Sequence, residues 1–456
     1  MQTQIFTAHK RHLGLRAPTV LAVGFALTIL VGALVLMLPV SAADGQITPF
    51  LDALFTAASA SCVTGLVTVS TAVHWSVFGK CVILLLIQIG GLGFMSVAAI
   101  ASFVLRRTIT LHERMVMSAG LNLSDGGGIV RLTRRVLFGT FIIEGTGAVL
   151  LSCRFVPHYG FPKGITMGVF HAVSAFCNAG FDLMGTPDDP FQSLIGWAED
   201  PLVNITVMAL IVLGGLGFFV WSDVWDKHSF CRLRLHTKIV LTATAGLLLF
   251  GFGWTLLFEW SNPATLGAFD TPHKLLAAAF ESVTLRTAGF NTIDLGALTG
   301  PSQAVSCLLM FIGGSPGSTA GGIKTVTAAV LVLTAISAFC GRTTVSAFGR
   351  TIAPRSIMNA VTLLMAGGVL CLVGACAIAG IEDAPFHQCL FEAVSAFGTV
   401  GVSMGLTPTL AAASRVILIV MMYMGRVGVL TLGVAVFMRR REPPRLKYPD
   451  ADVFIG

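Results

Sequence analysis

Charged side chains are scarce in this chain, since Asp, Glu, Lys and Arg make up 11% of its 456 residues. Soluble domains average about 25% charged residues, so a water-exposed surface over most of the molecule is excluded. Apolar residues, by contrast, make up 55%. About eight apolar stretches are close to the ~20 residues that a helix needs to cross a bilayer. The composition therefore predicts an all-α integral membrane protein.

Metal-binding and catalytic patterns are also missing. The ten cysteines are scattered and include no Cys-x-x-Cys pair, so neither a zinc site nor a disulfide framework is indicated. No cluster of His, Asp and Glu and no activated nucleophile lies within the apolar stretches, which argues against a membrane enzyme. We therefore expect no enzymatic activity and no organic cofactor.

The few charges fall on two sides of the chain. Basic residues gather at both ends and in loops near 106–135, 227–238 and 342–355, whereas the alternate loops are mainly acidic. The positive-inside rule then places both termini and the basic loops in the cytoplasm, below the cell inner membrane. The acidic outer loops would concentrate cations at the outer surface. The net charge of +7 follows from this topology, so no nucleic acid partner is indicated.

The first apolar stretch has two interpretations. Residues 19–40 follow three basic residues and precede Ser41-Ala42-Ala43, which is similar to a signal-peptide cleavage site. The stretch is 22 residues long, whereas the apolar region of a signal peptide has about 7–15. Its length therefore favours a membrane span over a cleaved signal.

One short pattern occurs four times. Each copy begins with Phe and reaches a Gly nine or ten positions later: Phe55 to Gly65, Phe170 to Gly180, Phe280 to Gly289 and Phe391 to Gly401. These glycines are 115, 109 and 112 residues apart. The near-constant period predicts a fourfold internal repeat. The repeats are residues 1–106, 107–230, 231–350 and 351–438, followed by a cytoplasmic tail at 439–456.

Each repeat is predicted as a helix, a short pore segment and a second helix, which gives eight spans around a central pore. The expected spans are residues 17–40 and 79–105, 129–153 and 201–222, 237–258 and 302–336, and 356–380 and 413–438. The segments between them are too short and too polar to cross a bilayer. Irregular backbone at membrane depth is tolerated only where it is buried in protein or lines a wet cavity. Four such segments around one axis predict a pore.

An extended stretch follows each short segment's helix and forms the predicted selectivity filter. Its twelve residues are Val63, Thr64, Gly65, Asn178, Ala179, Gly180, Thr287, Ala288, Gly289, Thr399, Val400 and Gly401. Glycine permits backbone angles that let carbonyl groups face the axis, and converging carbonyls replace the water shell of a potassium ion. The stretches contain no acid and no His, which disfavours transition metals. Potassium, bound by backbone carbonyls, is therefore the predicted transported ion.

Glycines also recur in the second helices. Gly90, Gly214, Gly313 and Gly425 lie 25, 34, 24 and 24 residues after the pattern glycines. In the first two repeats we expect these glycines to allow close helix packing.

The second helix of the third repeat contains a run that cannot stay helical. It consists of Gly313, Gly314, Ser315, Pro316, Gly317, Ser318, Thr319, Ala320, Gly321 and Gly322. Pro and repeated Gly disfavour helix, so two half-helices should flank a loop below the filter, and its glycines predict that this loop moves at little energetic cost. A phosphate-binding loop is the competing interpretation, but Ile323 separates Gly322 from Lys324 and no strand precedes the run.

Four ionisable residues inside the membrane region stand out. Arg426 is a lone charge among apolar residues 416–436, and we interpret it as a gating residue that bonds the loop at 313–322. A purely structural Arg satisfied by carbonyls is the alternative. Glu144 is expected to form a hydrogen bond between helices. Glu281 and Glu392 share one position in two short helices and are expected to hold the loop N-terminus against its own amides.

These motifs together carry a resemblance. The four pore segments, the run from Gly313 to Thr325 and Met424-Gly425-Arg426-Val427-Gly428 resemble the Trk/Ktr/HKT superfamily of potassium transporters. The chain length and the tail from Tyr448 to Gly456 are most similar to the membrane subunits of bacterial Ktr systems. The resemblance implies a gate at 313–322, a homodimer with one pore per subunit in membrane lipid, and a cytosolic nucleotide-binding regulatory ring. Gly in all four filters, Gly65 included, fits the potassium-preferring members, with sodium as a candidate activator.

The leading hypothesis is channel-like potassium uptake. An ion-coupled secondary transporter of a small solute is the alternative, because such proteins also contain repeats and broken helices. Their repeats are typically twofold and often inverted, however, with the substrate bound at the midplane. Four copies that run in one direction favour the potassium pore.

Overall fold

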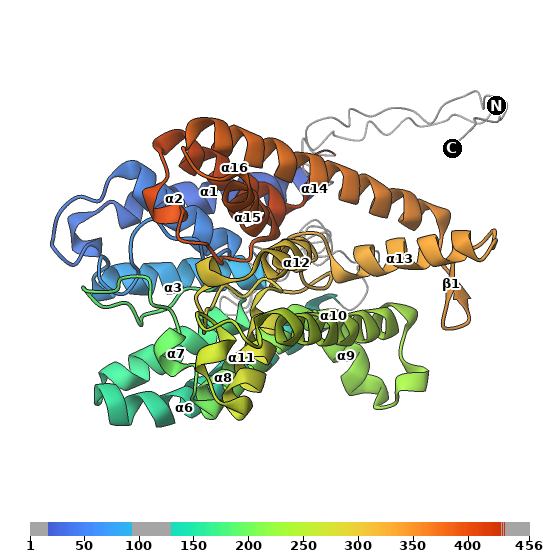
Figure 1. The fold of residues 1–456 in the computed structure, drawn as a ribbon, viewed down its shortest axis with the longest axis horizontal. Helices are drawn as coiled ribbons and strands as arrows, with labels where there is room; N and C mark the ends of the chain where they lie inside the picture. The colour runs from blue at the N-terminus through green and yellow to red at the C-terminus, as the bar shows by residue number, and fades with distance from the viewer. Residues whose placement is uncertain (1–16, 94–128, 430, 432, 434–456) are drawn as a thin grey trace, which may run out of the picture.

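The computed structural model describes residues 17–93, 129–429, 431 and 433 (Figure 1). Four long apolar helices organise this part of the chain: α1 (Ala17–Leu36), α6 (Ile129–Tyr159), α10 (Leu235–Glu259) and α14 (Pro354–Ile381). Among the described residues, these four helices are long and apolar enough to cross a membrane by themselves. They correspond to the predicted first helix of each repeat.

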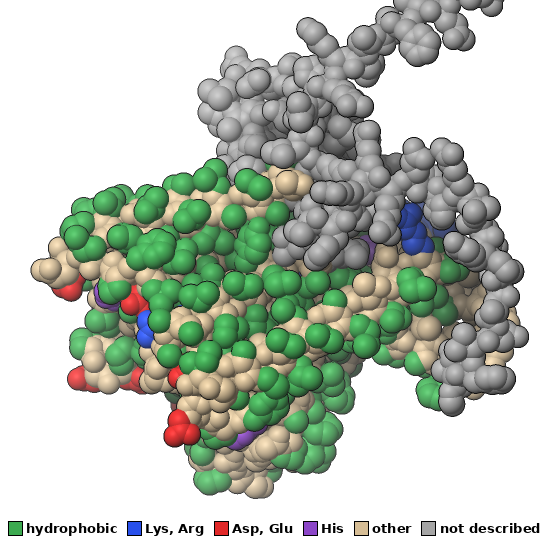
Figure 2. Space-filling view, turned by 90° about the horizontal axis from the view of Figure 1, so that it is seen from above, with side chains coloured by type: hydrophobic (Ala, Val, Ile, Leu, Met, Phe, Trp, Pro, Cys, Tyr) green, Lys and Arg blue, Asp and Glu red, His purple; other side chains and the backbone are tan. Residues whose placement is uncertain are grey.

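The outward faces of the long helices are apolar. Large side chains that are 57–70% exposed come from each of them: Leu27, Phe141, Leu249 and Met365. On the face that Figure 2 shows, hydrophobic side chains are spread over the described residues, and acidic side chains are gathered at one end. An apolar surface this extensive is stable only against another apolar phase. It therefore fits a molecule surrounded by lipid.

A short helix and a second helix follow each long helix, and we call each such set a unit. The short helices are α2 (Phe50–Cys62), α7 (Lys163–Phe176), α11 (Thr271–Thr284) and α15 (Phe386–Gly398). The second helices are α3 (Val77–Leu92), α8 (Pro201–Leu216) with α9 (Phe218–Lys227), α12 (Gly300–Phe311) with α13 (Thr325–Phe339), and α16 (Ala412–Val427).

Within the described residues, the connections contain only short regular elements. Single 3₁₀ turns are η1 (Pro39–Ser41), η2 (Ile195–Trp197), η3 (Phe230–Arg232), η4 (Leu266–Ala268), η5 (Leu295–Ala297) and η6 (Thr407–Thr409). After α13, strand β1 (Ser346–Ala347) pairs antiparallel with β2 (Arg350–Thr351), with Ser346 opposite Thr351.

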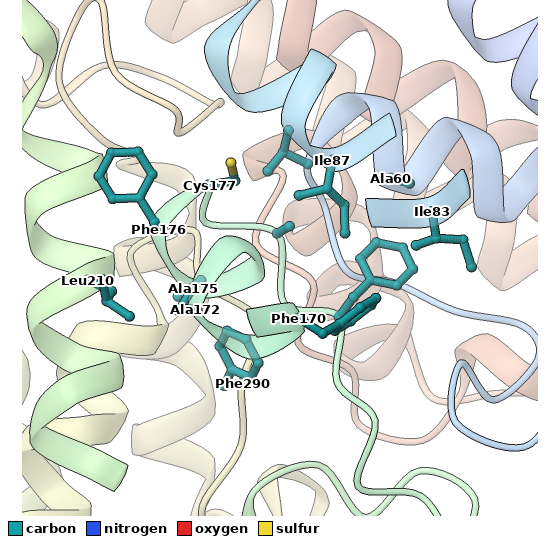
Figure 3. Close-up of a cluster of buried hydrophobic side chains, with 14 of the residues drawn as sticks. Ala60, Ile83, Ile87, Phe170, Ala172, Ala175, Phe176, Cys177, Leu210 and Phe290 are labelled. Carbon is teal, nitrogen blue, oxygen red and sulfur yellow. The ribbon is translucent and has the colours of Figure 1, made fainter. Parts of the chain in front are cut away.

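The units pack in a closed cycle. The second helix of each unit contacts the short helix of the next: α3 contacts α7, α8 contacts α11, α12 contacts α15, and α16 contacts α2. The last of these contacts joins the fourth unit to the first, and α1, α2 and α16 lie side by side in Figure 1. Figure 3 shows the core where Ile83 and Ile87 of α3 approach Phe170 of α7. The four phenylalanines that begin the sequence pattern are at most 4% exposed, so they anchor the short helices in this core.

The second helices are shorter than the sequence suggested. The expectation of an unbroken helix at 201–222 is wrong, because α8 ends at Leu216 and the chain turns by 92° into α9. Gly217 at the turn has φ +94°, and Gly93 and Gly428 end α3 and α16 with φ +82° and +91°. Such angles are incompatible with a right-handed helix. Residues 94–105, 430, 432 and 434–438 of the predicted spans lie outside the described residues, so a total of eight spans stays a prediction.

Glycines let the second helices lie against the ends of the short helices. A Cβ atom added to Gly90 would overlap the carbonyl oxygen of Ser61, and one added to Gly214 would overlap that of Phe176. Gly425 stands in the same relation to the carbonyl of Phe397. The close packing expected at Gly90 and Gly214 is therefore confirmed, and it extends to the fourth unit.

Gly214→Ala should destabilise the protein by about 1–3 kcal/mol, because its methyl group would overlap a carbonyl in a packed interior. Thermal unfolding of the purified protein in detergent measures this change. Gly253→Ala in α10 is the matched control, since nothing lies within 4 Å of the added methyl group and alanine favours helix. An unfolding temperature for Gly214→Ala at or above that of Gly253→Ala would contradict the packing argument.

Candidate functional site

The four predicted filter stretches share one backbone geometry. Their first residues have left-handed φ angles of 58°, 58°, 68° and 53°, at Val63, Asn178, Thr287 and Thr399. Their last residues, Gly65, Gly180, Gly289 and Gly401, have φ angles of 98°, 68°, 83° and 93°. A left-handed φ at a β-branched residue is strained, and such strain persists only where the surroundings enforce it. The same left-handed turn occurs at four places and is strained at the three β-branched residues, which indicates one constraint that acts on all four stretches.

The four stretches converge on a single axis. A Cβ atom added to Gly65 would lie 3.1 Å from Cα of Gly180 and 3.3 Å from Cα of Gly401. One added to Gly289 would lie 2.8 Å from Cα of Gly180 and 3.4 Å from Cα of Gly401. The structure therefore brings together the four glycines of the predicted filter, and any side chain on them would enter the ring that they form.

Carbonyl oxygens occupy the same ring. A Cβ atom added to Gly65 would lie 2.7 Å from the carbonyl oxygen of Ala179. One added to Gly180 would lie 2.8 Å from that of Ala288, and one added to Gly289 would lie 2.7 Å from that of Val400. From Gly401, the nearest atom is the carbonyl oxygen of Thr64. Each glycine thus lies beside the carbonyl of the middle residue in a neighbouring stretch. The middle residues themselves are completely buried.

The short helices add negative electrostatic potential near these carbonyls. Each of α2, α7, α11 and α15 ends one to three residues before its stretch begins, and a helix C-terminus carries about half a negative charge. The twelve residues of the stretches have no ionisable side chain. Neutral carbonyls and helix ends can bind a monovalent cation that has lost water. They lack the acidic ring that divalent cations use.

A chamber of about 230 Å³ lies on one side of the ring, and its lining includes the four ring glycines together with Asp182 and Asp294. Asp182 accepts a hydrogen bond of 2.9 Å from the backbone N–H of Met184. Burial raises the pKa of Asp182 to about 6, and the N–H groups of Met184 and Gly185 oppose part of this rise. A carboxyl group is charged above its pKa, so the chamber is negative at neutral pH and becomes less so on acidification.

The Gly-rich loop covers the opposite side of the ring. A Cβ atom added to Gly313 would lie 3.2 Å from Cγ2 of Thr287, and Gly321 lies against the side chain of Thr399. Oγ1 of Thr319 lies 3.1 Å from Oδ1 of Asn178. The loop therefore touches the first residue of three of the four stretches, as expected for a segment below the filter.

The break between α8 and α9 holds this loop in place. The backbone N–H of Ser315 donates to the carbonyl of Gly215 at 3.0 Å, and that of Thr319 donates to Gly214 at 3.3 Å. The first N–H of α9, at Phe218, donates to the carbonyl of Gly317 at 2.9 Å. Helix ends leave backbone groups unpaired, and here the loop pairs with them. The sequence predicted that the loop moves at little energetic cost, but that prediction did not include these hydrogen bonds, which must break if the loop moves.

Arg426 joins the loop to the first unit. Its guanidinium donates to the carbonyl of Thr319 in the loop and to those of Gly90 and Gly91, the latter at 3.2 Å. The bond to the loop is the one that the sequence suggested. Within the described part of the chain, no carboxylate pairs with Arg426, so its charge is held by carbonyl dipoles alone. It borders a cavity of about 590 Å³ that Lys324 and His236 also line.

The buried glutamates differ in their roles. Glu144 accepts a hydrogen bond of 3.1 Å from Gln88, which links α6 to α3 and confirms the expected bond between helices. Glu392 was expected to hold the loop N-terminus, and this is wrong. It accepts from Ser403 at 2.5 Å and from Thr407 at 2.6 Å, both of which follow the fourth stretch. Glu281 is buried, and its oxygens find no partner among the described residues.

Sequence reasoning missed one buried cation. Arg286 directly precedes the third stretch, is 7% exposed, and donates to the carbonyl of Gly313 and the hydroxyl of Thr325. Alignment of the four copies could have found it, because the equivalent residues in the other units are Cys62, Cys177 and Gly398.

Comparison with known proteins relates the chain to cation transporters. The TrkH family, described as "Cation transport protein", matches residues 4–442. The chain is 42% identical over 439 residues to the Ktr system potassium uptake protein B of Bacillus subtilis, with 96% of each chain covered. It is 40% identical over 441 residues to the potassium/sodium uptake protein NtpJ of Enterococcus hirae, again with 96% of each covered.

A solved structure has the same fold. The potassium transporter TrkH of Vibrio parahaemolyticus superposes with a TM-score of 0.70 at 17% sequence identity. The match covers 94% of this chain and 86% of that one.

Glu392→Ala should lower the free energy of unfolding by about 3 kcal/mol, because two hydroxyls and the N–H of Met404 would lose a buried acceptor. Glu392→Gln, which keeps one acceptor oxygen, should fall between this variant and wild type. Thermal unfolding in detergent is the measurement, and Glu199→Ala, which removes an exposed carboxylate, is the control. Equal unfolding temperatures for Glu392→Ala and Glu199→Ala would rule out the anchoring role.

Proposed function

Because this chain belongs to the TrkH family of cation transport proteins, we propose that it carries potassium ions into the cell through the ring of its four filter stretches. The chain is a multi-pass protein of the cell membrane, in keeping with its family and its apolar helices. The observation that carries the proposal is the ring itself, in which four glycines lie beside four carbonyls. The relatives reported above are named for potassium uptake, which supports the choice of ion.

In this proposal the filter residues are Val63 to Gly65 and their counterparts at 178–180, 287–289 and 399–401. Carbonyl oxygens of the middle residues replace water around the ion. The C-termini of the short helices supply negative potential without a fixed charge that would hold the ion too firmly. The chamber above, with Asp182 and Asp294, collects cations before they lose water. Sodium remains part of the proposal as an activator, since one relative is named for both ions.

We assign the gate to residues 313–322 and Arg426. The loop touches three of the filter stretches, so an ion leaving the ring would meet it at once. The guanidinium of Arg426 is bonded to that loop and has no carboxylate partner within the described residues, so it also repels a cation at short range. Movement of the loop away from the α8–α9 break would open the path.

The wider organisation is likewise proposed. Four repeats at 1–106, 107–230, 231–350 and 351–438 would supply eight spans, with both termini and the tail at 439–456 in the cytoplasm. The name of one relative refers to a Ktr system, which supports the presence of a regulatory partner. We propose that this partner is a cytosolic ring that binds nucleotide. A second copy of this chain is the proposed membrane partner.

The other functions considered are not favoured. The relatives reported above are named as transport proteins rather than enzymes. Coupled transport of an organic solute finds no support in their names. The decisive experiment is uptake of labelled rubidium and of a panel of solutes by liposomes that contain the purified chain.

Gly→Ser at position 65, 180, 289 or 401 should reduce the preference for potassium over sodium by about tenfold, which corresponds to ~1.4 kcal/mol of lost coordination energy. The added side chain enters the ring and displaces a neighbouring carbonyl. Potassium and sodium uptake by a bacterium that lacks its own potassium transporters measures the preference.

Gly45→Ser is the matched control for backbone strain, because Gly45 also has a positive φ of +70° but has nothing within 4 Å of an added Cβ. It should leave selectivity unchanged. Unaltered selectivity in all four ring variants would remove the filter assignment.

Deletion of residues 315–320 should raise rubidium uptake into liposomes that contain the membrane subunit alone, because it removes the cover over the ring. Gly313 lies against the carbonyl of Gly321, so the cut ends at 314 and 321 are close enough to be rejoined. Arg426→Ala should raise uptake less, since it removes one anchor and one repelling charge but leaves the loop. Arg135→Ala, which breaks an exposed ion pair with Asp226, is the control. If neither change increases uptake by folded protein, the loop is a structural break and not a gate.

A further inference from the structure

The third unit differs from the others at the residue before its filter stretch. This residue is small in three units, as Cys62, Cys177 and Gly398, and is Arg286 in the third. In those three units, Gly90, Gly214 and Gly425 bring the second helix against the end of the short helix. In the third unit the equivalent residue is Gly313, where the second helix has already ended. The arginine therefore occurs in the one unit where the loop replaces the helix.

The Arg286 side chain contacts both ends of the loop. Its Nη2 lies 2.8 Å from Oγ1 of Thr325, the first residue of α13, and 3.3 Å from the carbonyl oxygen of Gly313, which follows α12. The hydroxyl of Thr325 donates to the same carbonyl at 2.9 Å. One guanidinium thus bridges two helix ends that are 12 residues apart in the chain.

Backbone hydrogen bonds also join the two ends of the loop, which we call its base. The N–H of Gly313 donates to the carbonyl of Ile323 at 2.8 Å, and that of Thr325 donates to Gly314 at 3.0 Å. These bonds lie within the third unit. The residues between them, 315–322, bond to the second unit, at Gly214 and Gly215, and to Arg426 of the fourth unit. One bond returns to the third unit, from Nζ of Lys324 to the carbonyl of Ala320 at 2.6 Å. The loop therefore has a base tied to its own unit and a tip tied mainly to its neighbours.

A buried guanidinium without a carboxylate is costly to keep, and none pairs with Arg286 among the residues that the structure describes. We propose that Arg286 is a positioning residue that clamps the base of the gate loop to the third filter stretch, so that only 315–322 moves when the pore opens. The clamp protects Thr287, the next residue, from being pulled out of the ring by the moving tip. This inference rests on the proposed potassium pathway and adds the division of its gate into a fixed and a mobile part.

Loss of the clamp should affect ion uptake differently from release of the mobile tip. In the absence of the regulator, Arg286→Gln should raise rubidium uptake several-fold. It should also lower the ratio of rubidium to sodium uptake, because the base of the loop and the filter stretch would loosen together. Arg426→Ala should raise uptake with that ratio unchanged, because it releases the tip alone. Arg286→Lys, which keeps a charged donor, should restore part of the ratio.

Thr325→Val tests the same clamp without touching the arginine. It keeps the shape of the side chain and removes the hydroxyl, so it should change uptake and ratio in the same direction as Arg286→Gln, but less. Thr327→Val, on the same turn of α13 and outside the clamp, is the matched control and should behave as wild type. Where Arg286→Gln does not fold, Thr325→Val decides.

The measurements use liposomes that contain the purified full chain, with rubidium and sodium uptake followed in parallel. No rubidium flux with the wild-type chain would overturn the proposed function and the clamp with it. Wild-type flux with an unchanged ratio in both Arg286→Gln and Thr325→Val would overturn the clamp alone. A reduced ratio in both, with Thr327→Val unchanged, supports it.

Discussion

Four backbone segments approach one another around a single axis, and this contact sets the requirements for the rest of the fold. It is possible only because each segment contributes a glycine at the same level, beside a carbonyl of its neighbour. The segments can reach the axis only if the short helices end there, which their buried phenylalanines ensure. The second helices must then lie against those helix ends, which explains the glycines at 90, 214 and 425.

Much of this arrangement could be predicted from the sequence, because one short pattern occurs in it four times. The Phe-to-Gly pattern gave the four short helices and the stretches after them, and four equivalent segments in a closed cycle must meet. The end of α8 could not be predicted in this way. Gly214-Gly215-Leu216-Gly217 can continue as a packed helix, and it bends here where residues from the third unit pair with its free carbonyls. Hydropathy along one segment carries no information about such a partner.

The same limit applies to individual side chains. Glu392 looked like a helix-end charge, yet its partners are 11 to 15 residues further along, in a loop without periodicity. Arg286 reaches residues 27 and 39 positions away, on both sides of an interrupted helix. The bond of Arg426 to the loop was accessible from the sequence because a lone charge in an apolar stretch must find polar groups nearby. For Arg286, only its departure from the other three copies marked the position.

The contact between α16 and α2 closes the ring within one polypeptide. In a ring of four identical subunits, one altered codon changes four positions at once. Here it changes one quadrant, and the quadrants differ in sequence, with Val63, Asn178, Thr287 and Thr399 at equivalent places. Natural selection can therefore change the ring one segment at a time. One quadrant can acquire a mobile segment while the other three keep a fixed structure.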